Sequence, residues 1–183
     1  MTTTTEVRKL EGTYDADTIH SVFGFAVRHA DISTYRGNLS DVEARLTADG
    51  DGVALEGSAG VESISIQNPP EFRAHVLGGE FFDAEQHPRV SFRSTEVDLS
   101  EDGRARVEGE LTIRGVTREV TAVGSYEAPR ESAGGLRSAF ELEATFDRRD
   151  FGLDWQMEMP GGADALGWDV TLEIHLELVQ AQE

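Results

Sequence analysis

The sequence from residue 168 to residue 178 reads WDVTLEIHLEL, and every second residue in it is apolar. Side chains that alternate in this way point to opposite faces of a β-strand, so one face is buried and the other faces water. The same period of two recurs in residues 104–113, 116–126 and 136–146. Four long half-buried strands in succession favour an antiparallel meander, and in a chain of 183 residues such a meander usually closes into a barrel.

The first half of the chain shows the same alternation in shorter runs, which we interpret as four further strands. They cover residues 17–28, a segment that ends at Leu46, residues 53–66 with a bulge near 62–63, and residues 89–99. The total is eight strands, the number at which a closed barrel has room for one small ligand.

Two segments break the alternation and are predicted to form short helical insertions. Residues 29–35 favour a helical turn, and residues 71–77 follow two prolines and place Phe72 and Val76 four positions apart. The complete pattern predicts an all-β fold, an eight-stranded antiparallel β-barrel with short helical insertions.

The charge and composition of the chain exclude several kinds of partner and chemistry. A balance of 16 basic and 35 acidic residues gives a formal net charge of −19, which would repel nucleic acids and anionic membrane surfaces. Cysteine is absent from the sequence, which excludes disulfides, thiolate chemistry and Cys-ligated metals. No run approaches the roughly 20 apolar residues that a membrane-spanning helix needs, so no integral membrane segment is expected.

The length of the chain suits one domain, which we place at residues 12–183. Residues 1–11 are polar and lack the apolar region of a signal peptide, so a disordered polar leader and a cytoplasmic location are expected.

Four phrases, in order, resemble the YceI family. They are YDADTIHSVFGFAVRH at 14–29, FFDAEQHPRVSFRST at 81–95, GELTIRGVT at 109–117 and DFGL at 150–153. Together they span residues 14 to about 178. The chain departs from the family pattern at Asp147, where Asn is usual, and at Leu166-Gly167-Trp168, where Ile-Gly-Asp is usual. The resemblance implies a lipocalin-like barrel that binds a lipid or polyisoprenoid.

The apolar and aromatic side chains on the buried faces are the candidate ligand-binding residues. They could simply fill the barrel, since burying each of them stabilises the fold by roughly 1.5–3 kcal/mol. The resemblance favours a cavity that they line, with the insertion at 68–82 as a gate over its mouth. The candidates are Phe23, Phe25, Val27, His29, Phe72, Val76, Phe81, Phe82, Phe92, Leu111, Ile113, Phe140, Phe146, Phe151, Trp155 and Trp168.

Arg148 and Arg149 are the candidates for binding a lipid head group, because a guanidinium at a barrel rim can hold a phosphate or quinone oxygen. The alternative is a turn held by an Arg–Asp pair. The histidines show no spacing that would converge on a metal ion, so no metal and no cofactor is expected. These histidines are His20, His29, His75, His87 and His175.

The sequence therefore predicts a non-enzymatic protein that binds, transports or stores an amphipathic isoprenoid lipid, either a polyisoprenoid or an isoprenoid quinone. Two alternatives stay open. One is a lipid cyclase or isomerase of the same shape, which would need a buried acid or base. The other is a stress-related accessory protein with a filled barrel. Whether the chain forms a homodimer is also left open.

Overall fold

The computed structural model describes residues 9–132 and 134–182, so most of the expected leader lies outside the described residues. Its strands are β1 (Gly12–Ala16), β2 (Val22–His29), β3 (Ser33–Leu39), β4 (Val42–Asp49), β5 (Gly52–Gly60), β6 (Arg89–Leu99), β7 (Arg104–Ile113), β8 (Val116–Ser132), β9 (Gly135–Asp147) and β10 (Leu166–Gln180). The helical elements are α1 (Pro70–Leu77) and the 3₁₀ turns η1 (Val61–Ser63) and η2 (Arg148–Phe151). None of the described helices is long and apolar enough to cross a membrane.

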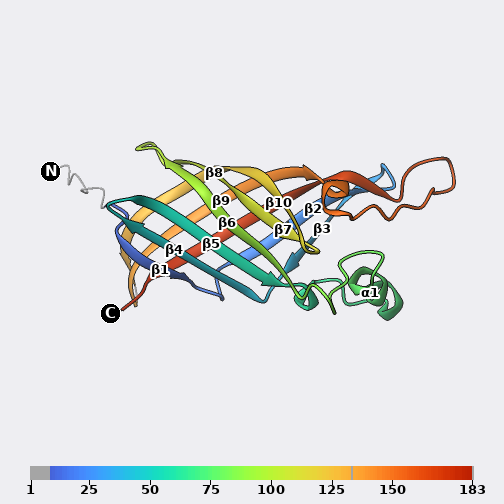
Figure 1. Ribbon diagram of the computed structural model, residues 1–183, viewed down its shortest axis with the longest axis horizontal. Helices are drawn as coiled ribbons and strands as arrows, with labels where there is room; N and C mark the ends of the chain where they lie inside the picture. Colours follow the sequence, from blue (N-terminus) through green and yellow to red (C-terminus); the bar gives the residue numbers. More distant parts are fainter. Residues whose placement is uncertain (1–8, 133, 183) are drawn as a thin grey trace.

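The strands form one antiparallel sheet that closes on itself (Figure 1). The strand order is β1-β4-β5-β6-β7-β8-β9-β10, and β1 pairs with β10 to close an eight-stranded barrel. The sheet continues beyond β10, because β2 pairs with β10 and β3 pairs with β2. Since β1 and β2 pair with successive parts of β10, they are two halves of one kinked strand, and β3 and β4 are likewise two halves of the next. The predicted fold class and strand number are confirmed.

The predicted helical turn over residues 29–35 is wrong. Residues 29–32 form a tight β-turn in which the Ile32 amide donates to the His29 carbonyl at 3.0 Å. Ala30 and Asp31 have φ of 50° and 55°, the left-handed values of a type I′ turn. The twist of this turn suits a hairpin, so β3 follows β2 directly.

Two strand boundaries also differ from the prediction. The first strand was expected over 17–28, but residues 17–21 form the kink between β1 and β2, and Ile19 is 85 % exposed there. The third strand ends at Gly60, and the turn η1 takes up residues 61–63, where a bulge was expected. The short helix expected at 71–77 is present as α1.

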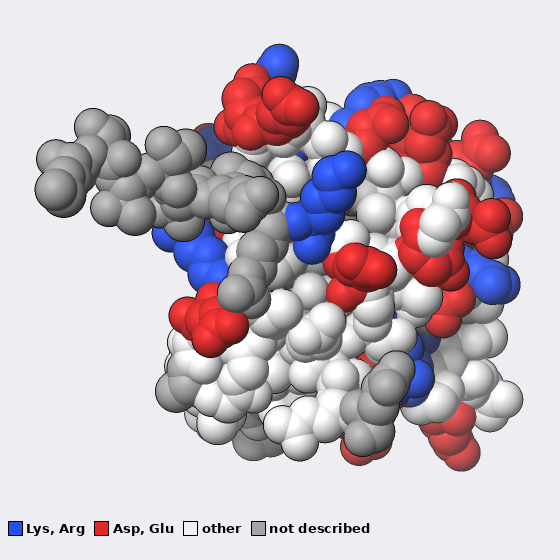
Figure 2. Space-filling model, turned by 90° about the vertical axis from the view of Figure 1, so that its left-hand side faces the viewer, with Lys and Arg blue, Asp and Glu red and all other residues white. Residues whose placement is uncertain are grey.

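The packing of the barrel interior changes along its axis, as the burial of the inward residues of β10 shows. Near the chain termini its inward residues Leu176 and Leu178 are buried in a packed cluster that includes Tyr14 and Phe140. Acidic and basic side chains lie among uncharged ones on the outside of this end (Figure 2). Toward α1, the inward Leu172 of β10 is only half-buried. An inward residue that is partly exposed faces a cavity, so the barrel is packed at one end and hollow at the other.

The insertion between β5 and β6 covers the hollow end (Figure 1). The Arg73 guanidinium on α1 donates to the carbonyls of Ile64 and Ile66 at 3.2 and 3.1 Å. Ile64 in turn forms a bridge with Leu39 at the end of β3. The helix is thereby tied to the sheet through one short segment, and Val76 packs inward from it.

Candidate ligand-binding cavity

Two apolar hollows lie in series inside the barrel. The inner hollow has a volume of about 90 Å³ and lies between β2 and the strands β4 to β10. The outer hollow has a volume of about 390 Å³ and opens beside α1 and the β2–β3 turn. An apolar cavity of about 150 Å³ can hold benzene, so the outer hollow has room for a larger ligand.

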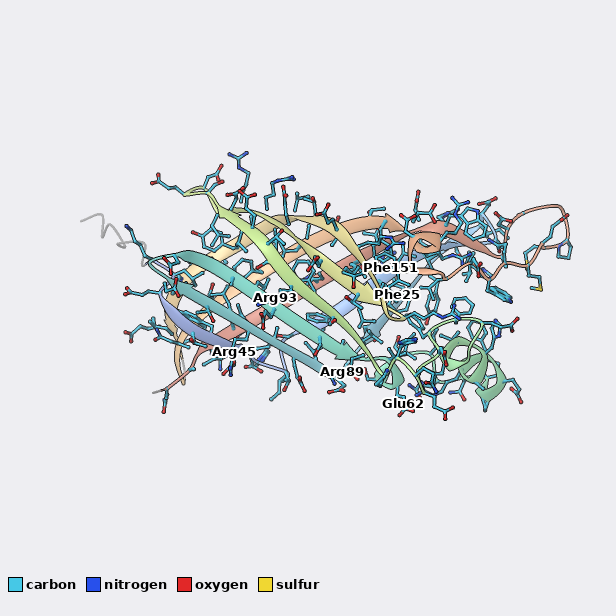
Figure 3. The ribbon with its side chains drawn as sticks, in the orientation of Figure 1. Phe25, Arg45, Glu62, Arg89, Arg93 and Phe151 are labelled. Carbon is cyan, nitrogen blue, oxygen red and sulfur yellow. The ribbon has the colours of Figure 1, made fainter. Side chains whose placement is uncertain are left out.

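Phe25 stands where the two hollows meet. Together with Leu39, Val90 and Leu172 it lines both of them. Its side chain lies inside the half of the barrel nearest α1, as does that of Phe151 (Figure 3). The two hollows therefore adjoin at Phe25.

Glycines on other strands make room for the cavity-lining rings. Phe25 is opposite Gly37 in the β2–β3 register, and a Cβ atom added to Gly37 would lie 2.5 Å from the Phe25 Cζ atom. A Cβ atom on Gly57 of β5 would lie 3.2 Å from the Phe23 Cζ atom. The rings can therefore lie flat against backbone, which no larger residue at Gly37 would permit without a shift.

Most of the candidate residues from the sequence line one of the hollows. Those at the inner hollow are Phe23, Phe25, Phe92 and Leu111. Those at the outer hollow are Phe25, Val27, His29, Phe72, Val76, Phe81, Phe82, Ile113, Phe146 and Arg148. This placement does not by itself test ligand binding, which stays a prediction for each of them.

Five candidates lie outside both linings. Phe140 belongs to the packed end, where its ring lies 5.8 Å from that of Tyr126. Phe151 is fully buried behind Phe146, at a ring distance of 4.9 Å. Trp155 packs on Phe81 and His75. The others, Trp168 and Arg149, stack on each other.

The sequence interpretation missed the polar edge of the outer hollow. Ser33, Thr34 and Tyr35 line it, because the hairpin at 29–32 returns the chain along the mouth. The wrong helical assignment for residues 29–35 hid them. The alternating pair Ser33 and Tyr35, which follows a two-residue turn, was the signal that could have revealed a strand.

Arg148 lines the outer hollow but does not offer a free cation. Its Nε donates to the Gly167 carbonyl at 2.9 Å, and its Nη1 donates to the carbonyls of Leu153 and Trp155. A fourth, longer contact joins Nη2 to the Leu166 carbonyl at 3.4 Å. The side chain is 2 % exposed, and burial lowers the pKa of Arg148. These bonds hold the loop between η2 and β10 against the barrel, so the group acts as a structural anchor.

Arg149 forms an ion pair with Asp147, the last residue of β9. The Arg149 Nη2 lies 2.5 Å from the Asp147 Oδ2, and the Arg149 backbone amide donates to the same carboxylate at 2.9 Å. Arg149 lowers the pKa of Asp147 to about 2. This is the turn held by an Arg–Asp pair that was the alternative to a head-group site.

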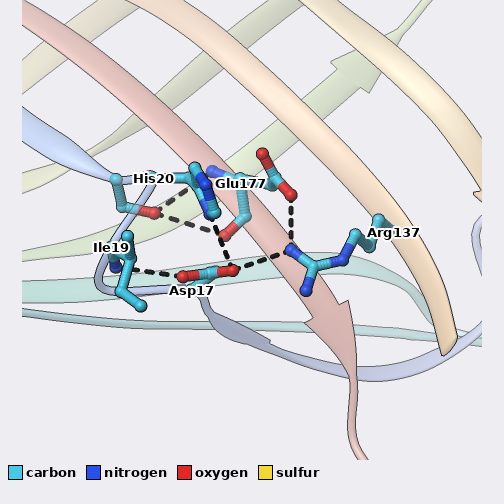
Figure 4. Close-up of polar contacts among 6 residues, drawn as sticks. Asp17, Ile19, His20, Arg137 and Glu177 are labelled. Atoms are coloured by element: carbon cyan, nitrogen blue, oxygen red, sulfur yellow. Dashed lines mark hydrogen bonds and ion pairs between the residues drawn. The ribbon is translucent and has the colours of Figure 1, made fainter. Parts of the chain in front are cut away.

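A second polar cluster lies at the kink between β1 and β2 (Figure 4). Side-chain ligand atoms of Asp17, His20 and Glu177 lie within 4.8 Å of one another, as in some metal sites. The Arg137 guanidinium already supplies the positive charge, because its Nη1 donates to Asp17 at 2.7 Å and also to Glu177. Arg137 and His20 hold the pKa of the Asp17 carboxyl well below its usual range. The cluster therefore fixes the kink and β10 together.

Comparison with known proteins agrees with this architecture. The sequence-family model of the YceI-like domain matches residues 14–178, nearly the whole chain. The chain belongs to the YceI family. The family assignment made from the four sequence phrases is confirmed.

Two curated relatives of this YceI-family protein are UPF0312 proteins. A UPF0312 protein of Vibrio cholerae is 27% identical over 169 residues, covering 91% of this chain and 85% of the relative. A UPF0312 protein of Pseudomonas aeruginosa is 30% identical over 145 residues, covering 76% of this chain and 74% of the relative.

Solved structures share the fold of this YceI-family protein. Burkholderia cenocepacia BcnA aligns with a TM-score of 0.72 and 18% identity, covering 88% of this chain and 98% of that one. A polyisoprenoid binding domain from Saccharophagus degradans, implicated in plant cell wall breakdown, aligns with a TM-score of 0.67 and 12% identity. The alignment covers 92% of this chain and 98% of that domain.

Proposed function

We propose that this YceI-family protein binds an amphipathic isoprenoid lipid without covalent chemistry, for its transport or storage. The observation that carries the proposal is the pair of adjoining apolar hollows, which lie between the mouth beside α1 and the packed end. The chain of the lipid would extend from the outer hollow toward the inner one, and its polar head would remain at the mouth. The description of the Saccharophagus degradans domain as polyisoprenoid-binding supports the choice of ligand.

The free energy of binding would come from removing apolar surface from water. Each Å² of apolar surface that leaves water contributes about 25 cal/mol before the costs of association are subtracted. Phe23, Phe25 and Leu172 are inward-facing but only partly buried, so their cavity faces are available for this contact. Because the barrel is held by backbone hydrogen bonds, it can keep this surface open without a ligand.

The two alternative functions have less support. An enzyme would need an acid or base placed in the cavity, but the ionisable groups among the described lining residues are scattered. They are Glu56, His29, Tyr35 and Arg148, and Arg148 is bonded to carbonyls. A filled barrel conflicts with the outer hollow of about 390 Å³.

The proposal is tested by native mass spectrometry of freshly purified protein and by displacement of an apolar fluorescent probe with geranylgeraniol. We expect a lipid-sized mass increment, saturable displacement and recovery of the alcohol chemically unchanged. The variant Val170→Trp, which adds a large ring to the outer hollow, should weaken the binding of both the probe and geranylgeraniol. Val123→Trp adds the same bulk on the outer face, where Val123 is 51 % exposed, and should have no effect. A protein that binds neither probe nor alcohol would refute the proposal.

A further inference from the structure

We infer that the cavity selects lipids with an uncharged polar head and discriminates against phosphorylated lipids of the same chain length. This inference rests on the proposed function and adds the chemical class of the head group. It follows from what the charged groups around the mouth are bonded to.

Guanidinium groups at the hollow end already donate hydrogen bonds to acceptors within the protein. Arg148 and Arg149 are held by loop carbonyls and by Asp147, as described above. The Nη1 of Arg114 donates to the Gly152 carbonyl at 2.7 Å, and its Nη2 donates to the carbonyl of Gly79.

Two further arginines of this end, Arg73 and Arg28, also donate to backbone carbonyls. Arg73 donates to the carbonyls of Glu62, Ile64 and Ile66. The Nη2 of Arg28 donates to the Asp31 carbonyl at 2.7 Å, and its Nη1 contacts the Thr34 hydroxyl at 3.4 Å. A phosphate would have to break such bonds to gain the charge-assisted contacts that normally hold it.

Fixed negative charge surrounds the same end. The segments that form it, residues 28–33, 61–88, 113–117 and 148–168, contain ten Asp or Glu residues and five Arg residues. The only lysine of the sequence is Lys9, near the opposite end (Figure 1). The potential at the mouth is therefore negative and disfavours the approach of a phosphate or diphosphate, whereas it has no such effect on an alcohol or quinone.

The polar groups that do line the mouth are uncharged hydrogen-bonding groups. They come from Ser33 and Tyr35, next to His29, whereas the Thr34 hydroxyl lies beside the Arg28 guanidinium on the other face of β3. His29 and Ser33 are paired in the β2–β3 register, and the Tyr35 ring lies 6.1 Å from that of Phe25 at the entrance to the inner hollow. Hydroxyl groups can donate to a carbonyl oxygen and accept from an alcohol, so they suit a neutral head.

The test compares farnesol, farnesyl phosphate and farnesyl diphosphate, which share one chain and differ in head charge. Each displaces a neutral probe, N-phenyl-1-naphthylamine, from the full-length protein at pH 7.5 and low salt. We expect farnesol to bind at least tenfold more tightly than either phosphorylated ligand, and the gap to narrow as added salt screens the carboxylates.

Adding one positive charge at the mouth should change this order. Ser33→Lys should raise the affinity for farnesyl phosphate severalfold relative to the affinity for farnesol. Ser100→Lys makes the same change of net charge in the exposed β6–β7 turn at the packed end, and should leave both affinities unchanged.

The outcomes separate the two proposals. If farnesyl phosphate binds as tightly as farnesol, the selectivity is refuted while lipid binding stands. If the probe binds and none of the three ligands displaces it, the isoprenoid function itself is refuted, and the inference falls with it.

Discussion

The guanidinium carbon of Arg148 lies 4.3 Å from the centre of the Trp168 ring, at the point where the loop after η2 joins β10. A cation stacked on an indole face in a buried position is attracted by the electrons of the ring. Arg148 thus connects η2, the loop carbonyls and β10 in one arrangement, and Trp168 covers it. The wall of the outer hollow depends on this arrangement.

Replacing Arg148 should therefore destabilise the protein strongly. Arg148→Met would leave the carbonyls of Leu153, Trp155 and Gly167 without their donor, at a cost of about 3 kcal/mol or more in the free energy of unfolding. The neighbouring Arg149→Met removes an exposed ion pair and a stacking contact with Trp168, and should cost much less. Urea denaturation at pH 7 measures both, and equal losses would contradict the anchor role.

Removing the Phe25 ring, which lies between the two hollows, should lengthen the cavity. Phe25→Ala joins the inner and outer hollows, so we expect the preference for geranylgeraniol over farnesol to rise severalfold. Phe140→Ala is the control, because Phe140 lies in the packed end. It should cost about 3–5 kcal/mol of stability and leave the chain-length preference unchanged. An unchanged preference in Phe25→Ala would show that the ligand does not pass Phe25.

The segment at 68–82 should control ligand exchange more than stability. Phe72 is 43 % exposed and lines the outer hollow, so Phe72→Ala removes contact with the ligand but little buried core. We expect a severalfold faster lipid dissociation and a change in melting temperature of only a few degrees, measured by stopped-flow fluorescence and thermal unfolding. Phe82→Ala should also speed dissociation, with a larger loss of stability because Phe82 is more buried. If lipid dissociates from both variants at the rate of the unmodified protein, the segment is part of the core and not a gate.

The cluster at the kink predicts a pH-dependent contribution of His20 to stability. Asp17, whose Oδ2 lies 2.9 Å from the His20 Nδ1, raises the pKa of His20. A raised folded pKa stabilises the protein fully below the unfolded value of about 6.5, and the contribution disappears as pH rises through the folded value. His20→Gln should therefore lower the melting temperature at pH 5.5 and have no effect at pH 9.

Asp17 should show the opposite pH dependence. Its pKa is lowered, so its contribution is present above the unfolded value of about 3.9 and disappears as pH falls through the folded value. The penalty of Asp17→Asn should thus be present at pH 7 and shrink on acidification below pH 4. In the Asp17→Asn background, His20→Gln should lose its pH dependence; persistence of that dependence would mean that another group is responsible.

The alternation of apolar residues made the strands predictable because it is local. Each residue of β10 faces in or out according to its own position, and the carboxylates on the outer face agree with that assignment. The turn at 29–32 was not predictable in the same way. It contains neither Gly nor Asn, and Ala30 adopts a left-handed φ of 50° that alanine rarely takes.

The sequence by itself determined the antiparallel barrel, its eight strands, the helix after the two prolines and the family, because these depend on short-range pattern. Most of the candidate residues that it supplied line the hollows, although many other lining residues were not among them. Only the tertiary structure decided which inward side chains meet a cavity and which meet one another. Phe23 and Phe140 both point inward, yet the first lines the inner hollow and the second lies in the packed end. The difference depends on which side chains reach across the interior at each position along the barrel axis. Tyr14, which fills the interior beside Phe140, lies far from it in the sequence.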